Sequence, residues 1–207
     1  MPGMGASSKI FEYLKFPAQY EIVHLSWFPP FKNELLSSYA KRMSMLVKHT
    51  NPILIGVSFG GILVQEMTRY IECRKVIIIS SVKSRNELPR IMKISGSLGL
   101  HRLIPSFLIK NIKSLVLLFY GSMMKKKFLL YEKYFTVRDP EYIFWAINSI
   151  INWQGIEAQK DPIHIHGSID RIFKINRIKD PYIKINGDHA IILTRHEWFN
   201  DFLSKKI

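Results

Sequence analysis

The sequence predicts an α/β domain in which helices flank a mostly parallel sheet. Short apolar runs typical of buried strands alternate with amphipathic runs at helical spacing. A strand–helix–strand order at this spacing favours parallel pairing with right-handed crossovers. The alternation stops over residues 83–160, which show helical patterns and no convincing strand. We therefore expect a core formed by residues 1–82 and 161–207, interrupted by a helical insertion at 83–160.

The first part of the core is predicted to contain three strands and two helices. Residues 20–25 read as a short strand, and residues 33–49 carry apolar side chains at helical spacing. The continuous apolar run at 52–57 predicts a buried parallel strand. A helix over 59–72 and a strand of β-branched residues at 76–79 complete this part.

The insertion and the second part of the core contain two predicted helix starts. Asp139-Pro140-Glu141 offers an N-cap acceptor, a proline for the first turn and a carboxylate that favours the helix dipole. The sheet is predicted to resume at 162–166 and 182–185. A final helix is predicted to open with a capping box over 194–197.

Length and composition exclude several classes of protein. The 207 residues fit one domain with an insertion, and the 47% apolar content argues against disorder. The single cysteine, Cys73, permits no internal disulfide and fits a reducing compartment. The N-terminus shows no signal-peptide pattern, and the most apolar stretch, 115–120, is too short to span a bilayer. A cytoplasmic location is therefore expected.

The strongest chemical motif is Gly56-Val57-Ser58-Phe59-Gly60, between a predicted buried strand and a predicted helix. In that context G-x-S-x-G is typical of a nucleophile elbow, a tight turn that exposes a serine hydroxyl at the start of a helix. Bulky neighbours would clash in so tight a turn, which explains the glycines at 56 and 60. Ser58 is therefore the candidate nucleophile.

A serine nucleophile needs a base, and the base needs a carboxylate. His189 follows the last predicted strand and is the candidate base, whereas His164 and His166 lie inside a predicted strand and are expected to be structural. Asp170, just beyond the penultimate strand, is the preferred carboxylate. Its rivals are Asp161, Asp180 and Asp188.

Acyl transfer at a serine also needs amide donors for the developing oxyanion. The backbone N–H of Phe59, directly after the nucleophile, is one candidate. The Gly-rich stretch at the N-terminus offers the other, because Gly3 and Gly5 permit a backbone bend around the N–H of Met4.

Together, the elbow, the chain order Ser58–Asp170–His189 and the Gly-rich loop resemble the α/β-hydrolase superfamily over essentially the whole chain. The resemblance implies a serine hydrolase, here a carboxylesterase, that cleaves esters, thioesters or amides through an acyl-enzyme with neither metal nor organic cofactor. It also implies that the insertion at 83–160 is a lid.

One departure from the superfamily concerns its central strand. That strand precedes the loop that supplies an oxyanion donor (the oxyanion loop, here the Gly-rich residues 2–7). This chain begins at the loop, so we expect either unpaired backbone groups beside 53–57 or pairing of 20–25 with 53–57. An upstream start, with Met1 internal, is the accompanying expectation.

The formal charge of +14 is concentrated in the insertion. Residues 83–127 contain ten basic side chains and one acidic side chain, interleaved with aliphatic residues. Such a basic amphipathic surface suits an acidic carrier protein or an anionic membrane surface, or is simply a solvated outer face. Nucleic acid ranks lower, because no aromatic stacking platform accompanies the charges.

Two alternatives to a small-molecule carboxylesterase stay open. Some lid-bearing members of the superfamily cleave esters on acyl carrier protein and grip it with basic lid residues, so an ester or thioester hydrolase acting on such a carrier is one. A non-enzymatic, hydrolase-like binding protein is the other.

Four residues near the predicted carboxyl ends of strands are candidates for lining a substrate pocket. Trp27 and Phe28 follow the first predicted strand, and Lys83 and Arg85 follow the strand at 76–79. The two cations would suit an acidic group on the substrate. The alternative is ordinary packing or solvation.

Overall fold

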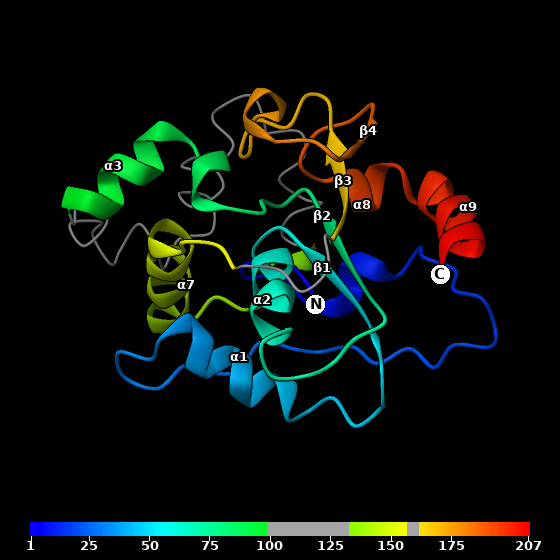
Figure 1. The fold of residues 1–207 in the computed structure, drawn as a ribbon, viewed down its shortest axis with the longest axis horizontal. Coiled ribbons are helices and arrows are strands. Elements are labelled where there is room, and N and C mark those ends of the chain that lie inside the picture. Colours follow the sequence, from blue (N-terminus) through cyan, green and yellow to red (C-terminus); the bar gives the residue numbers. More distant parts are fainter. Residues whose placement is uncertain (99–132, 157–161) are drawn as a thin grey trace.

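A parallel sheet forms the centre of the protein in its computed structural model, which describes residues 1–98, 133–156 and 162–207 (Figure 1). Within these residues the sheet has four strands in the order β1-β2-β3-β4, and every neighbouring pair is parallel. The strands are β1 (Ile53–Val57), β2 (Lys75–Ile79), β3 (Ile163–Gly167) and β4 (Ile183–Ile185). The predicted fold class is confirmed.

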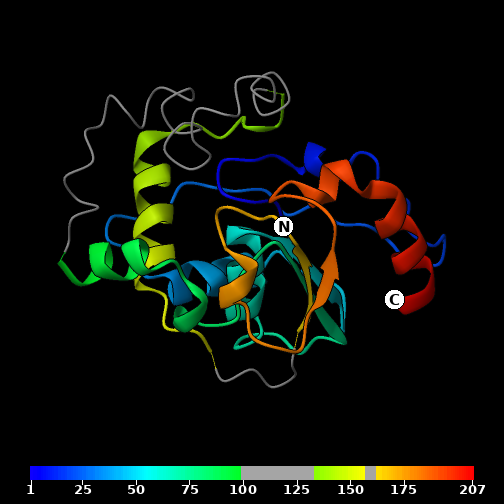
Figure 2. The ribbon, with the colours of Figure 1, turned by 90° about the horizontal axis from the view of Figure 1, so that it is seen from above.

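Helices cover both faces of the sheet (Figures 1 and 2). One face carries α1 (Leu36–Ser44), α2 (Phe59–Met67) and α7 (Pro140–Asn152). The other carries the 3-10 helix η1 (Ser8–Phe11), α8 (Ile191–Thr194) and α9 (His196–Lys206). The remaining described helices are η2 (Arg85–Glu87), α3 (Arg90–Leu98), which packs against α7, and η5 (Ile175–Arg177).

Strand β2 shows why the predicted strands read as continuous apolar runs. Val76 and Ile78 face the core that includes α1, α2 and α7, whereas Ile77 and Ile79 face the core beneath α8 and α9. A strand covered on both faces needs apolar side chains at every position. The apolar pattern therefore reports burial between two helical layers.

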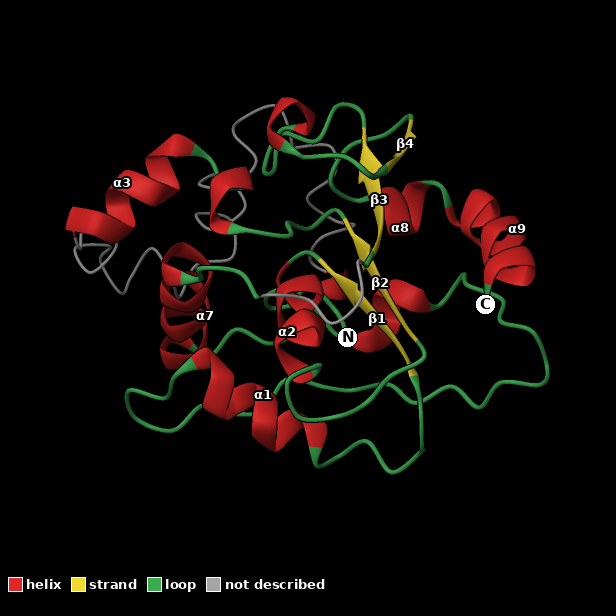
Figure 3. Ribbon diagram, in the orientation of Figure 1, coloured by secondary structure: helices red, strands yellow, loops and turns green. Residues whose placement is uncertain are grey.

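The prediction of a strand at 20–25 is wrong. The chain between η1 and α1 forms a long connection without regular structure (Figure 3), and Val23 is 52% exposed. The edge of β1 is occupied by Met1 instead. The Met1 amine donates to Ile55 O (2.6 Å), and Val57 N–H donates to Met1 O (3.1 Å). Residues 20–25 therefore do not pair with 53–57.

The helix ends differ in detail from the predicted ones. Both α1 and α2 are shorter than predicted: α1 ends before Met45, and α2 ends before Thr68. The predicted start of α7 is confirmed, since Asp139 caps it by accepting from Tyr142 N–H (2.8 Å). The predicted capping box is wrong: Thr194 ends α8, and α9 begins after Arg195 without a side-chain cap.

The described part of the insertion is anchored in the core through α7. Tyr142 and Trp145 are buried, and the Trp145 ring lies 5.8 Å from that of Phe59 in α2. Six of the ten basic residues at 83–127 lie outside the described residues: Arg102, Lys110, Lys113, Lys125, Lys126 and Lys127. None of the described helices combines the length and the apolar character needed to cross a membrane.

Candidate active site

Ser58 occupies a sharp turn between β1 and α2. Its backbone is in the left-handed half of conformational space, with φ 53° and ψ −119°. A Cβ on Gly56 would lie 2.3 Å from Gly60 O, and one on Gly60 would lie 2.3 Å from Pro2 O. Only glycine fits either position, as the G-x-S-x-G pattern predicts.

The turn at Ser58 is tied to the adjacent strand. Ser58 N–H donates to Ile79 O (2.9 Å), and the Ser81 hydroxyl donates to Ser58 O (2.7 Å). A Cβ on Gly61 would lie 2.5 Å from Ser81 Oγ, so this contact also needs glycine. The strained serine is therefore held through its amide and its carbonyl by the segment at 79–81.

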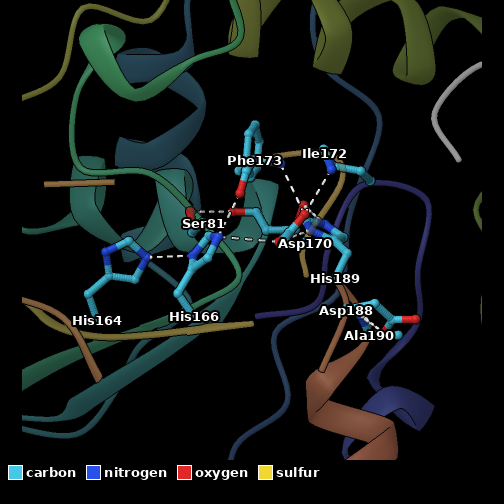
Figure 4. Close-up of polar contacts among 10 residues, drawn as sticks. Ser81, His164, His166, Asp170, Ile172, Phe173, Asp188, His189 and Ala190 are labelled. Carbon is cyan, nitrogen blue, oxygen red and sulfur yellow. Dashed lines mark hydrogen bonds and ion pairs between the residues drawn. The ribbon is translucent and has the colours of Figure 1, made fainter. Parts of the chain in front are cut away.

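The structure brings Ser58, His189 and Asp170 together from three separate loops. Ser58 follows β1, Asp170 follows β3, and His189 lies between β4 and α8. His189 Nε2 lies 2.9 Å from Ser58 Oγ. His189 Nδ1 lies 2.7 Å from Asp170 Oδ2 (Figure 4). A carboxylate only accepts, so Nδ1 carries the proton and Nε2 is free to accept the serine proton.

Asp170 is a buried carboxylate with several hydrogen-bond donors. Its Oδ1 accepts from the amides of Ile172 (2.8 Å) and Phe173 (3.0 Å), while Oδ2 faces His189 (Figure 4). Burial by itself raises the pKa of Asp170. The charge and hydrogen bond of His189, with smaller contributions from His166 and the Ile172 amide, outweigh burial and leave the pKa lowered. The carboxyl group is therefore ionised at neutral pH.

The rival acids take other positions. Asp188 accepts from Ala190 N–H (3.0 Å), and Asp180 is exposed. Asp161 lies outside the described residues. Among the described residues, no group of three or more histidine, cysteine or acidic side chains is placed to hold a metal ion.

Two further histidines extend the polar cluster behind Asp170. His166 Nε2 donates to Phe173 O (2.7 Å) and lies 3.4 Å from Asp170 Oδ2. Because that nitrogen carries a proton, the neutral His166 ring accepts at Nδ1 from His164 Nε2 (3.0 Å; Figure 4). Burial lowers the pKa of His166 and lowers that of His164 to about 3.

The prediction that both histidines are structural does not include the contact of His166 with Asp170 (3.4 Å). The signal was present. Residues two apart on a strand share a face, and the strand leads directly into the loop that carries Asp170. A polar pair on a face that is otherwise apolar indicates a buried network at the strand's carboxyl end.

The Gly-rich N-terminal stretch lies against the serine turn. Gly3 is close enough that a Cβ there would lie 3.4 Å from Ser58 Cβ. Ala6 N–H donates to Gly3 O (3.1 Å) and Gly5 has φ +72°, which together indicate a type II turn. In the described part of the chain, no acceptor is found for the N–H of Met4 or for that of Phe59. Both amides are therefore available to a ligand.

Of the predicted pocket residues, the structure brings Trp27 to this region. Its indole Nε1–H donates to Gly3 O (2.9 Å), and its ring stacks on Phe59 at 5.0 Å. Phe28 is turned toward other partners, since it stacks on Tyr39 at 4.4 Å with the Arg42 guanidinium 4.5 Å above its ring.

The two predicted cations belong to the base of the insertion. The Lys83 ammonium donates to Lys179 O (2.6 Å) and Pro181 O (3.1 Å), so it is engaged by backbone carbonyls. Arg85 is partly buried at the start of η2. The buried Glu87 accepts from the amides of Lys83 (2.6 Å) and Lys179 (2.9 Å) and joins the same two segments.

Comparison with known proteins assigns the fold. No protein-family model matches the chain, and no curated protein matches it. Solved structures do match over nearly its whole length. A hydrolase from Oleispira antarctica has a TM-score of 0.73 at 11% identity, covering 99% of this chain and 88% of its own.

Two esterase structures agree with that match. A lipase-esterase related protein from Clostridium acetobutylicum has a TM-score of 0.68 at 16% identity, covering 100% of this chain and 92% of its own. An esterase from Exiguobacterium antarcticum has a TM-score of 0.65 at 13% identity, covering 99% and 91%. The protein has the α/β-hydrolase fold.

Proposed function

We propose that the protein is a serine hydrolase that cleaves carboxylic esters through an acyl-enzyme. The observation that carries the proposal is the continuous hydrogen-bonded chain from Ser58 Oγ through His189 to Asp170. The fold shared with esterases and other hydrolases supports it. A small-molecule ester is the substrate class that this arrangement suits.

In the proposed reaction, Ser58 Oγ attacks the acyl carbon while His189 Nε2 takes the hydroxyl proton. Asp170 keeps the imidazole in the required tautomer and stabilises the imidazolium. The amides of Met4 and Phe59 bind the oxyanion of the tetrahedral intermediate. The C–O bond to the alcohol then breaks, and the alcohol leaves with the proton from His189.

Hydrolysis of the acyl-enzyme repeats these roles. A water molecule gives a proton to His189 Nε2 and attacks the acyl carbon, which again places negative charge on the oxygen facing the two amides. Collapse of that intermediate returns the proton to Ser58 Oγ and releases the carboxylic acid. Each step uses only side-chain and backbone groups of this chain together with water.

The insertion at 83–160 is proposed as the lid over this site. Its described helices α3 and α7 pack against each other, and α7 contacts α2, where the Trp145 ring lies 5.8 Å from that of Phe59, the residue after Ser58. The core at 1–82 and 161–207 then supplies Ser58, Asp170 and His189. A basic lid that docks an acidic carrier protein or an anionic membrane surface is a finer form of the same hypothesis.

A fluorophosphonate probe tests the proposal, because it labels only an activated serine. We expect stoichiometric labelling of the wild-type protein at Ser58, identified by peptide mass spectrometry, and no labelling of Ser58→Ala. Ser38→Ala, at an exposed position of α1, is the matched control and should be labelled like the wild type.

Turnover of short-chain p-nitrophenyl esters distinguishes an enzyme from a hydrolase-like binding protein. An active hydrolase gives an initial burst or steady release of p-nitrophenol that is lost in Ser58→Ala. A folded protein that neither reacts with the probe nor turns over any ester would contradict the proposed activity and favour the binding protein.

A further inference from the structure

The type II turn at residues 3–6 includes the N–H of Met4, for which no acceptor is found among the described residues. Ala6 N–H closes the turn on Gly3 O (3.1 Å), and Gly5 N–H donates to the hydroxyl of Tyr142 (3.3 Å). The contacts that fix the turn therefore also fix the direction of the Met4 N–H near Ser58.

The turn is held by a segment within the insertion, residues 134–142. Ser7 N–H donates to Tyr134 O (2.9 Å), and Val137 N–H donates to Gly5 O (3.0 Å). A short antiparallel bridge joins Ala6 to Phe135 between these bonds. Residues 134–142 and residues 3–7 thus form one hydrogen-bonded unit, although more than 120 positions separate them in the sequence.

Tyr142 holds the Met4–Gly5 peptide group, which is adjacent to the Gly3–Met4 group that carries the Met4 N–H. It projects from the first turn of α7, is 1% exposed, and has its ring 5.4 Å from that of Trp27. Trp27 in turn donates to Gly3 O and stacks on Phe59. The two aromatic side chains therefore contact the two residues that flank Met4, one through an acceptor and one through a donor.

The hydroxyl of Tyr142 is suited to this role because it stays neutral. Burial raises the pKa of Tyr142 well above its ordinary value. A neutral hydroxyl oxygen accepts from the Gly5 amide without placing a negative charge next to an oxyanion site.

We propose that Tyr142 is a positioning residue of the oxyanion loop, through which the helix that ends the insertion sets the direction of the Met4 N–H. This inference rests on the proposed hydrolase function. Tyr142 does not touch the reacting atoms; it acts on them through the Gly5 amide. The oxyanion donor then depends on the insertion as well as on the core.

The test compares Tyr142→Phe with Tyr39→Phe. Each substitution removes one buried hydroxyl from the same aromatic cluster. The Tyr39 hydroxyl bonds to the backbone of Phe28 (2.9 and 3.1 Å), away from the loop. For p-nitrophenyl acetate we expect Tyr142→Phe to lower kcat about 10-fold and to change KM less than about two-fold, because a misdirected donor acts on the transition state. Tyr39→Phe should leave kcat unchanged.

A second measurement does not depend on turnover. Hydrogen exchange followed by NMR should show the Gly5 amide exchanging about 10-fold faster in Tyr142→Phe than in the wild type. Tyr39→Phe should leave this amide as protected as in the wild type. A loss confined to kcat, together with faster exchange of the Gly5 amide, supports a positioning role for Tyr142. If the two buried hydroxyls served only to stabilise the fold, both variants would lose stability alike.

Two kinetic results and one exchange result would each contradict the positioning role of Tyr142. Equal kcat losses in the two variants, or unchanged kcat in Tyr142→Phe, overturn the proposal. Unchanged Gly5 exchange in Tyr142→Phe overturns it as well. If the wild-type protein turns over no ester, the proposed hydrolase function fails, and the exchange experiment still decides whether Tyr142 holds the loop.

Discussion

At the residue scale, the candidate site is a set of side chains whose protonation is determined by their partners. The Asp170 carboxylate accepts from two amides and from His189, which keeps it ionised although it is buried. Its position determines which nitrogen of His189 carries the proton. The chemistry proposed for Ser58 therefore depends on a residue that never contacts Ser58.

Replacing that carboxylate should remove most of the activity. In Asp170→Asn, the amide group can donate to His189 Nδ1 and favour the wrong tautomer, so we expect kcat to fall on the order of 10⁴-fold. Steady-state kinetics with a p-nitrophenyl ester provide the measurement, and circular dichroism checks the fold. Asp180→Asn, at an exposed rival position, should retain kcat within about two-fold. A comparable loss in both variants would contradict the assignment of Asp170.

At the scale of elements, the parts of the site are placed by helix starts and strand ends. Ser58 stands between β1 and α2, and Asp170 and His189 follow β3 and β4. Helix α7 contributes through its first turn, where the Asp139 carboxylate accepts from the amide of Tyr142. The cap of α7 and the contact with Gly5 thus meet at one residue.

Loss of this cap should destabilise the protein measurably. Asp139→Ala leaves the Tyr142 amide without its acceptor, and we expect the free energy of unfolding to fall by about 1 kcal/mol. Urea denaturation monitored by tryptophan fluorescence measures the change. Asp139→Asn keeps a side-chain oxygen that can cap the helix and should recover most of the stability. Equal destabilisation by Ala and Asn would show that the capping bond is not the cause.

The predicted strands were confirmed where a run of apolar residues reflects burial between two helical layers. The runs at β1 and β2 are apolar at successive positions because helices cover both faces, and that pattern is visible in the sequence. A strand was also predicted at 20–25, but among the described residues no strand pairs with this segment. Pairing depends on which backbone lies at the edge of β1, and there Met1 takes the place.

At the scale of the whole molecule, burial of His164 and His166 makes stability depend on pH. Both rings are neutral in the folded protein because burial lowers the pKa of each, to about 3 for His164, from an ordinary value of 6.5. Between about pH 6.5 and the folded value, the unfolded chain binds more protons than the folded one. The contribution of these two neutral histidines to stability is therefore fully present above that pH window. It is lost as the pH falls through the window.

Replacing one of these histidines should flatten the acid side of the stability profile. Each contributes up to about 1.4 kcal/mol per pH unit within its window. We expect His164→Gln, which can still donate to His166, to lose stability less steeply than the wild type between pH 6 and pH 4 in urea titrations. His49→Gln, whose side chain is 51% exposed, is the control and should keep the wild-type slope. Parallel slopes for all three proteins would rule out the buried ring as the cause.

The fold class, the serine turn and the order of the three candidate catalytic residues could all be predicted from the amino-acid sequence. Each depends on a local property: apolar runs that reflect burial, glycines where a Cβ cannot fit, and polar residues that directly follow strands. The three-dimensional fold was needed to show that Asp170 is the acid that contacts His189 and that His166 lies 3.4 Å from Asp170. It also decided that the N-terminal loop is held by Trp27 and Tyr142. These are contacts between distant segments, and a one-dimensional pattern carries no information about which buried hydrogen-bonding groups will satisfy each other.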